Sequence, residues 1–338
     1  MNAVDLRIRE RLAAHRDQLA GLTAQRGGKG LVDLMRRVDA ALAAVQVGTW
    51  GICAVCQGGI PVDQLGGDPL LTVCLECLGP EQRRALERDL EAAARVQRTL
   101  LPAPYQRQGG WEVAHLWEPL GAVSGDHVDL IPPGHPGASL DLFVGDVSGK
   151  GVAAALLQSH LHALFRALSP TGLALADLLG KANDLFAEAT SAARYATLAA
   201  LRLHSDGRLE LANAGHPRPL LADGRGVRPL EGGSLPLGMF RDSTFNRREL
   251  RLGPGQTLLV YTDGWTEGAR DEEEFGIGRA AAALRRHHPL PLPELLAECR
   301  GELDRFLGGA ARGDDLTLVA VRRLGPVLLR GQGSAAKP

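Results

Sequence analysis

The segment LDLFVGDVSGKGVAAALL (residues 140–157) combines a strand, an acidic turn and the start of a helix. Apolar residues dominate Leu140–Val144, which predicts a β-strand. Gly145-Asp146-Val147-Ser148-Gly149 then predicts a tight turn, because glycine permits the backbone angles that turns require. The Ala- and Leu-rich run that follows predicts a helix over residues 151–168. The segment therefore places one carboxylate, Asp146, at the end of a predicted strand.

Short apolar runs of the same character recur along the chain. They predict strands over residues 196–203, 209–212, 257–261 and 316–321. A second helix is predicted over residues 173–189, next to the first. Strands with distant partners and a pair of helices inserted among them predict an α+β sandwich. Residues 325–338 are rich in Gly, Ala and Ser, and they predict a disordered tail.

Aspartates also stand in turns at the edges of other predicted strands. These turns are Ser124-Gly125-Asp126, Tyr261-Thr262-Asp263-Gly264 and Gly313-Asp314-Asp315. A single Asp-Gly turn is a common feature and carries little weight. Four acidic turns with no His or Cys cluster among them predict a cation site of hard oxygen ligands, which favours Mg²⁺ or Mn²⁺ over zinc.

The composition of the whole chain excludes several classes of protein. Its 338 residues have a formal net charge of −1, so bulk charge does not draw the protein to nucleic acid or to an anionic membrane. No apolar run approaches the roughly 20 residues of a membrane helix. The N-terminal sequence MNAVDLRIRE lacks the apolar core of a signal peptide. We therefore expect a cytoplasmic globular protein without a membrane or nucleic-acid partner.

Two CxxC pairs contain four of the five cysteines: Cys53 with Cys56, and Cys74 with Cys77. This spacing is typical of a tetrahedral four-cysteine zinc site, since each CxxC turn presents two thiolates on one side. Redox-active dithiols and disulfides are the alternatives. The two pairs and the lack of an export signal favour one structural Zn²⁺. Cys299 lies in a predicted helix and is expected to be an ordinary buried residue.

Helical patterns flank the cysteine segment. Apolar residues at heptad spacing predict two helices before it, and Gly27-Gly28-Lys29-Gly30 separates them, which indicates a helical hairpin. After the cysteines, a helix rich in Arg, Glu and Ala is predicted from Pro80 to Leu101. Its apolar stripe would either pack on its own domain or form a homodimer, and the sequence favours neither. The predicted organisation is a hairpin and zinc module at 1–79, a helical linker at 80–104, the sandwich at 105–324 and the tail at 325–338.

The hairpin, together with GTWGICAVC (residues 48–56) and LLTVCLEC (residues 70–77), resembles the DksA/TraR-type zinc finger family over residues 1–78. In that family the hairpin can enter the secondary channel of RNA polymerase, with acidic residues at its tip. Here the turn has no carboxylate before Asp33. This departure favours a module that senses a signal or docks a partner, such as an upstream activator.

Residues from about 92 to 323 resemble the SpoIIE-type branch of the metal-dependent (PPM, type 2C) serine/threonine phosphatases. The matching segments, in order, are AARVQRTLLP, AVSGDHVD, LFVGDVSGKGVAAALL, RYATLAAL, LANAGHPRPLL, SLPLGM, LVYTDGWTEGAR and GDDLTLVAV. The resemblance implies a PPM-type β-sandwich flanked by helix pairs, with two metal ions at one end. Departures from the family pattern occur at Ser124, His127-Val128 and Tyr195, and none of them removes a metal-binding carboxylate.

The same resemblance implies the roles of the acidic residues. Those expected to bind two Mn²⁺ or Mg²⁺ ions and to carry catalysis are Asp126, Asp146, Val147 (through its backbone carbonyl), Asp263 and Asp314. Asp146 would bridge both ions, while Asp129 and Asp315 would bind water or support the ligands. A hydroxide shared by the ions would attack phosphorus in line, without a covalent enzyme intermediate. His216 is either a catalytic acid or, as is commoner in such a turn, a residue that orders its loop.

These features together predict a protein serine/threonine phosphatase with an N-terminal zinc finger. The resemblance implies a phosphoserine or phosphothreonine substrate on a regulatory partner, such as an anti-sigma factor antagonist in a partner switch. The zinc module occupies the place of a sensor, and its state would reach the helices at 151–189 through the helix at 80–101.

Two other functions compete with this prediction. One is a polymerase-binding, DksA-like transcription regulator with a vestigial phosphatase domain, and the missing acidic tip argues against it. The other is a scaffold that binds a phosphoprotein without turnover, and the complete set of carboxylates argues against it.

Overall fold

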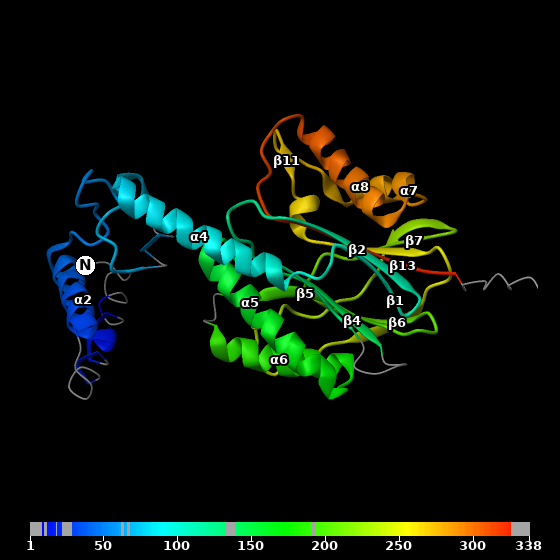
Figure 1. Ribbon diagram of the computed structural model, residues 1–338, viewed down its shortest axis with the longest axis horizontal. Coiled ribbons are helices and arrows are strands. Elements are labelled where there is room, and N and C mark those ends of the chain that lie inside the picture. The colour runs from blue at the N-terminus through cyan, green and yellow to red at the C-terminus, as the bar shows by residue number, and fades with distance from the viewer. Residues whose placement is uncertain are drawn as a thin grey trace, which may run out of the picture. The chain divides into compact units, whose positions relative to one another are not determined.

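The structure is a computed structural model (Figure 1), and it describes residues 9, 12–17, 19–21, 29–61, 64–65, 68–132, 139–190 and 194–325. The chain divides into two compact units, Met1–Asp89 and Leu90–Pro338. Gly27 and Gly28 of the predicted hairpin turn and nearly all of the predicted tail lie outside the described residues. Within the described ranges, no helix combines the length and the apolar character that crossing a bilayer requires.

The first unit contains a helical part and the cysteine segment. Helix α2 (Lys29–Val47) packs Val45 against Leu12 of the preceding helical segment, an arrangement that fits the predicted hairpin. The cysteine segment has a core of its own, and the short 3-10 helix η1 (Leu75–Cys77) lies at its end. The buried residues of that core are Cys53, Ile60, Leu65 and Cys74.

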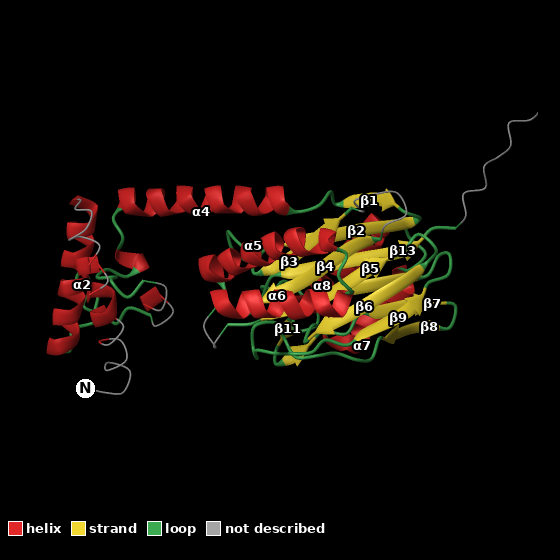
Figure 2. Cartoon of the chain, turned by 90° about the horizontal axis from the view of Figure 1, so that it is seen from below, coloured by secondary structure: helices red, strands yellow, loops and turns green. Residues whose placement is uncertain are grey.

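The second unit is a sandwich of two antiparallel sheets (Figure 2). The six-stranded sheet has the order β1 (Tyr105–Gln108), β2 (Trp111–Glu118), β13 (Leu316–Arg323), β10 (Thr257–Tyr261), β7 (Leu220–Asp223) and β8 (Gly226–Pro229). The five-stranded sheet has the order β3 (Asp126–Ile131), β4 (Leu140–Val147), β5 (Ala196–Leu203), β6 (Arg208–Ala214) and β9 (Arg247–Arg251). A separate hairpin is formed by β11 (Ala269–Arg270) and β12 (Glu273–Glu274).

Pairs of helices cover both outer faces of the sandwich (Figure 1). The five-stranded sheet is covered by α5 (Gly151–Leu168) and α6 (Leu175–Ala189), with the 3-10 helix η2 (Ser169–Thr171) between them. The six-stranded sheet is covered by α7 (Gly276–His287) and α8 (Leu292–Leu307).

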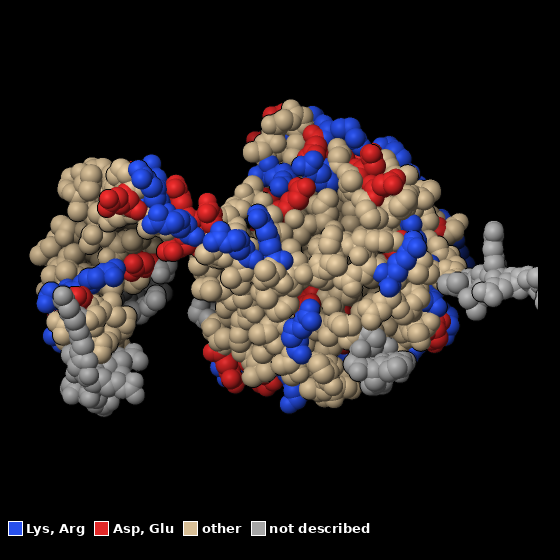
Figure 3. Space-filling view, viewed as in Figure 1, with Lys and Arg blue, Asp and Glu red and all other residues tan. Residues whose placement is uncertain are grey.

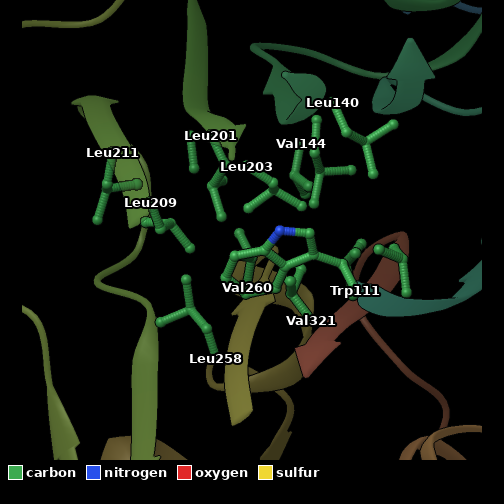
Figure 4. Close-up of a cluster of buried hydrophobic side chains, with 14 of the residues drawn as sticks. Trp111, Leu140, Val144, Leu201, Leu203, Leu209, Leu211, Leu258, Val260 and Val321 are labelled. Carbon is green, nitrogen blue, oxygen red and sulfur yellow. The ribbon is translucent and has the colours of Figure 1, made fainter. Parts of the chain in front are cut away.

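An apolar core fills the space between the two sheets (Figure 4). Trp111 is fully buried in it, and the indole Nε1 donates a hydrogen bond to the carbonyl of His204 at 2.9 Å. The surrounding side chains come from both sheets and include Leu140, Val144, Leu201, Leu258, Val260 and Val321. Strands such as β4 and β10 are covered on both faces, and for this reason their sequences are nearly continuous apolar runs.

Helix α4 (Pro80–Leu100) begins in the first unit and ends in the second. In the second unit, Ala94 of this helix packs against Val123, which lies before β3, and against Ala155 of α5. Val96 remains 58% exposed. The end of the helix thus packs on its own domain, and homodimer formation through α4 stays a prediction.

The predicted α+β fold is confirmed, and α5 and β5 have the bounds expected from the sequence. The second helix begins at Leu175, two residues later than predicted, because Gly172 adopts a left-handed conformation (φ +75°) just before it. Several strands escaped prediction, since their sequences are not apolar. β3 carries two aspartates and a histidine, and β9 (RRELR) is a charged strand at a sheet edge.

Candidate functional site

The four predicted aspartates lie where the ends of the two sheets meet. Asp126 and Asp146 are directly opposite each other in the register of β3 and β4. Asp263 opens the 3-10 helix η3 (Asp263–Trp265) after β10, and Asp314 precedes β13. Because β10 and β13 pair in antiparallel fashion, the end of one strand lies beside the start of the other. The fold therefore gathers the acidic turns at one end of the sandwich.

Asp126 links the two sheets at this end. Its Oδ2 accepts hydrogen bonds from Oγ1 of Thr262 at 2.9 Å and from Oγ1 of Thr317 at 2.5 Å, and both threonines belong to the six-stranded side. Burial, followed by the charge of Asp146, raises the pKa of Asp126 well above its ordinary value. The sequence did not single out either threonine, since a hydroxyl in a strand carries no distinctive pattern.

Asp146 lies among the other carboxylates. Burial, together with the charges of Asp263 and Asp314, raises its pKa to about 8. Burial and the charge of Asp314 also raise the pKa of Asp263. Carboxylates that repel one another in a partly buried site are unfavourable without a compensating cation. A divalent cation removes this repulsion, so the donor set fits metal binding.

Lys150 supplies a positive charge at the edge of the carboxylate cluster. Its Nζ lies 3.0 Å from Oδ2 of Asp314 and donates a hydrogen bond to the carbonyl of Gly313 at 2.6 Å. The ammonium therefore neutralises part of the charge of Asp314. Lysine holds such a position as a compact point charge that can also attract a phosphate group.

Gly125 leaves space beside two potential metal ligands. A Cβ at this position would lie 3.0 Å from the carbonyl oxygen of Val147 and 3.2 Å from Oδ1 of Asp146. These two oxygens belong to residues expected to bind the ions. The site thus offers carboxylate and carbonyl oxygens around a space that a larger residue would fill, and this is the donor chemistry that Mg²⁺ and Mn²⁺ prefer.

Asp315 supports the loop that presents Asp126. Its carboxylate accepts hydrogen bonds from the backbone N of Leu120 at 2.6 Å, from Oγ of Ser124 at 2.7 Å and from the backbone N of Gly125 at 3.0 Å. Three donors from one loop occupy this carboxylate, which makes it a positioning residue for the turn before β3.

Asp129 lies apart from the other acidic residues. Side chains alternate along a strand, so Asp129 and Asp126 point to opposite faces of β3. The Asp129 carboxylate accepts hydrogen bonds from Nε and Nη2 of Arg166 on α5 at 2.8 and 2.6 Å. The structure thus places the Asp129 carboxylate against α5, on the face of β3 opposite to Asp126.

Gln97 connects the end of α4 to the turn before β3, and sequence reasoning did not identify this role. Its Nε2 donates to the carbonyl of Ser124 at 2.8 Å, and its Oε1 accepts from the backbone N of Ser124 at 3.0 Å. Its Nε2 also donates to Oε1 of Gln158 on α5 at 3.3 Å. The signal in the sequence for this role was a glutamine close to the end of a predicted amphipathic helix.

The Gln97→Leu substitution is expected to lower the free energy of unfolding by about 2–4 kcal/mol, because it leaves the buried backbone groups of Ser124 without partners. Urea denaturation followed by circular dichroism measures the effect. Gln82→Leu on the first turn of α4 is the matched control, since the Oε1 of Gln82 accepts a hydrogen bond from Gly79 at an exposed position. Equal losses of stability in the two variants would contradict this role for Gln97.

His216 is buried in its loop. Its backbone N donates to Oδ1 of Asn213 at 2.8 Å, and Nδ2 of Asn213 donates to the carbonyl of His216 at 2.9 Å. The ring Nδ1 lies 3.0 Å from Oγ1 of Thr197. Burial lowers the pKa of His216 to about 3. A neutral imidazole with these bonds favours the loop-ordering role over that of a proton donor.

The four cysteine thiols of the first unit converge. Their ligand atoms all lie within 4.8 Å of one another, and Sγ of Cys56 lies 3.9 Å from Sγ of Cys74. Hydrogen bonds from the backbone of Cys56 and Cys74 lower the pKa of Cys53 to about 6, whereas burial raises the pKa of Cys74 to about 12. Cys53 thus forms a thiolate readily, while zinc would have to displace the proton of Cys74. The predicted pairs therefore form one cluster.

Comparison with known proteins defines the class of the second unit. A solved structure, the SiaA-PP2C domain of Pseudomonas aeruginosa, superimposes with a TM-score of 0.61 at 24% identity and covers 71% of this chain and 97% of that domain. The fold of the second unit is therefore that of a PP2C domain. Residues 136–324 match the family described as Stage II sporulation protein E (SpoIIE), and the chain belongs to this family.

Two curated relatives extend the match in sequence. Protein IcfG of Synechocystis sp. is 29% identical over 265 residues, which cover 70% of this chain and 41% of IcfG. Phosphoserine phosphatase RsbU of Bacillus subtilis is 25% identical over 244 residues, which cover 71% of this chain and 72% of RsbU. The chain thus spans less than half of the length of IcfG and nearly three quarters of that of RsbU. The zinc-finger resemblance of residues 1–78 stays a prediction.

Proposed function

We propose that this protein is a metal-dependent phosphatase that removes phosphate from a phosphoserine or phosphothreonine of a regulatory partner protein. The partner we propose is an anti-sigma factor antagonist of a partner switch. The observation that carries this proposal is the convergence of Asp126, Asp146, Asp263 and Asp314 at one end of the sandwich. The relative RsbU, a phosphoserine phosphatase by name, supports the choice of substrate.

The carboxylates and the carbonyl of Val147 would hold two Mn²⁺ or Mg²⁺ ions. When bound, such ions activate water near neutral pH and neutralise charge on the phosphoryl group. Thr262 and Thr317 fix the Asp126 carboxylate through their hydroxyls. Lys150 restrains Asp314 and supplies a positive charge close to the position of an incoming phosphate. These contacts hold the acidic groups in place before substrate arrives, which is the main contribution that a protein makes to such a reaction.

A groove beside the carboxylates fits a protein substrate. It has a volume of about 270 Å³, and its lining includes Leu120, Lys150, Val152 and Asp314. Val152 is 48% exposed and Leu156, one turn further along α5, is 67% exposed. In Figure 3 the surface over α5 and α6 shows few charged side chains, whereas the surface over α7 and α8 shows many. An apolar surface next to the reactive centre suits a folded protein better than a small phosphate ester.

Phosphate release from a phosphoserine-containing anti-sigma factor antagonist tests this proposal. Release is expected to require Mn²⁺ or Mg²⁺, to stop on addition of EDTA and to resume on addition of excess metal. p-Nitrophenyl phosphate is the matched control substrate, and the protein substrate is expected to have the higher kcat/KM. Metal-independent release would contradict the proposed mechanism, and a lack of preference for the protein substrate would contradict the proposed partner.

We further propose that the four cysteines bind one structural Zn²⁺ and that the first unit is a sensor or docking module acting through α4. The bonds from Gln97 near the end of α4 to Ser124 support this route, because Ser124 lies two residues before Asp126. A signal that shifts α4 would therefore reach the turn that presents a metal ligand.

The double substitution Cys53→Ser/Cys56→Ser is expected to abolish zinc binding at this cluster and to change Mn²⁺-dependent phosphate release by about fivefold or more, the size of a typical coupling between sites. Zinc content and steady-state kinetics are the two measurements. Val55→Ser is the matched control, since Val55 lies between these cysteines and is 65% exposed. Unchanged kinetics in a folded, zinc-free double variant would contradict coupling between the units.

A further inference from the structure

A second cluster of metal-binding side chains lies beneath α5, on the far side of β3 from Asp126. His127 and Asp129 are two residues apart in β3, so both point to the face that α5 covers. His162 reaches the cluster from α5. One ligand atom from each of the three residues lies within 4.8 Å of the others.

Two imidazole nitrogens in this cluster lack hydrogen-bond partners among the described residues. They are Nε2 of His127 and Nδ1 of His162. His127 and Asp129 are 0% exposed, and Nδ1 of His162 lies 3.3 Å from Oδ2 of Asp129 without hydrogen-bond geometry. A buried polar atom without a partner costs free energy, and native structures tend to avoid this cost. Two such atoms beside one carboxylate indicate a missing ligand.

We propose that His127, Asp129 and His162 bind a divalent transition-metal ion of the zinc class, at a site separate from the carboxylate cluster. Imidazole nitrogen with one carboxylate oxygen is a ligand set that zinc accepts, whereas Mg²⁺ prefers oxygen alone. Two histidines and one aspartate leave a fourth position for water.

The charges of the cluster are compatible with a cation. Arg166 now pairs with Asp129, but the Arg166 side chain is 42% exposed and has room to turn toward solvent. The ion would thus replace a guanidinium as the counter-charge of Asp129. The 14% exposure of the His162 side chain gives the ion an entry path.

Hydrogen bonds determine which nitrogen of His127 carries its proton. The backbone N–H of Ser124 donates to Oε1 of Gln97, and the carbonyl of Ser124 accepts from Nε2 of Gln97, which fixes the orientation of the Gln97 amide. Nε2 of Gln97 then donates to Oε1 of Gln158, so Nε2 of Gln158 is left to donate to Nδ1 of His127 at 3.1 Å. The neutral His127 ring therefore carries its proton on Nε2.

Metal binding at Nε2 of His127 would move this proton to Nδ1. Gln158 would have to turn its amide so that Oε1 accepts the proton, and Gln158 could then no longer accept from Gln97. The metal and the Gln97–Gln158 hydrogen bond are thus alternatives, which links the site to the end of α4.

Zinc stoichiometry of the full chain tests this proposal. Metal-free protein is titrated with Zn²⁺ against a chromophoric chelator, with excess Mg²⁺ present to occupy the carboxylate cluster. The wild type is expected to bind one more Zn²⁺ per chain than His162→Ala. The cysteine cluster contributes equally to both proteins and cancels. His160→Ala is the matched control, since His160 lies on the same helix outside the cluster, and it is expected to retain the extra ion.

His127→Asn is a second variant that is expected to lose the extra ion. Circular dichroism and thermal melting identify the variants that fold. Equal stoichiometry in the wild type and in a folded His162→Ala or His127→Asn variant would overturn the proposal, as would loss of the ion in His160→Ala.

The linkage through Gln158 has its own measurement. Gln97→Leu removes the bond that competes with the metal, so its affinity for the extra Zn²⁺ is expected to rise by about tenfold, the scale of one buried hydrogen bond. An unchanged or lower affinity would overturn the linkage.

Discussion

Asp146→Asn is expected to lower Mn²⁺-dependent phosphate release by about 10³-fold or more, equivalent to ~4 kcal/mol in the activation barrier. The substitution keeps the size of the side chain but removes a charge from the carboxylate opposite Asp126, beside Asp263 and Asp314. The remaining acidic residues would then bind the two ions more weakly. Steady-state kinetics over a range of Mn²⁺ concentrations, with isothermal titration of Mn²⁺, measures both effects.

The same variant is expected to be at least as stable as the wild type when no metal is present. Burial and neighbouring charges raise the pKa of Asp146 to about 8, so its ionised form is unfavourable in the metal-free fold. Thermal melting in EDTA is therefore expected to give an equal or higher Tm for Asp146→Asn. Asp271→Asn, in an exposed loop, is the matched control and is expected to change neither activity nor Tm. A large loss of metal-free stability in Asp146→Asn would show that the carboxylate is structural and would contradict this role.

The positions of the four candidate acidic ligands were predictable because each stands at or beside the end of a strand, where sequence patterns are local. Asp146 follows a continuous apolar run, and Asp263 follows another. The strand that positions Asp126 was not predictable, because DHVDLI lacks the apolar character of a buried strand. Its two aspartates accept hydrogen bonds from threonines and from an arginine that lie far away in sequence.

Contacts between distant segments could not be predicted from the sequence either, because the partners lie far apart in the chain. Nothing near Gln97 in the chain indicates that its amide bonds the backbone of Ser124, 27 residues later. His127 was visible only as a departure from the family pattern. Its proposed role as a metal ligand depends on His162 of α5, which the fold places beside it. The sequence alone does not show which residues of a helix and a strand face each other.

Gly125→Ala is expected to lower kcat/KM by about 10²-fold at limiting Mn²⁺, because small displacements of reacting groups have large effects on rate. The added methyl would lie 3.0 Å from the carbonyl oxygen of Val147 and 3.2 Å from Oδ1 of Asp146. Both contacts are tighter than ordinary, so one of the two oxygens must move. Gly125 does not have a positive φ, so the backbone tolerates alanine and the effect comes from the side chain alone.

The metal dependence of this loss distinguishes a displaced ligand from a damaged fold. If the methyl displaces metal ligands, saturating Mn²⁺ restores part of the activity, and the Mn²⁺ concentration for half-maximal rate rises in Gly125→Ala. Gly278→Ala on α7 is the matched control: a Cβ there meets nothing within 4 Å, and alanine in a helix is favourable by about 0.5–1 kcal/mol. That control is expected to keep wild-type kinetics. An activity loss in Gly125→Ala without any shift in Mn²⁺ requirement would show that the space beside Val147 and Asp146 serves substrate and not metal, because only a metal-binding role ties the defect to ion concentration.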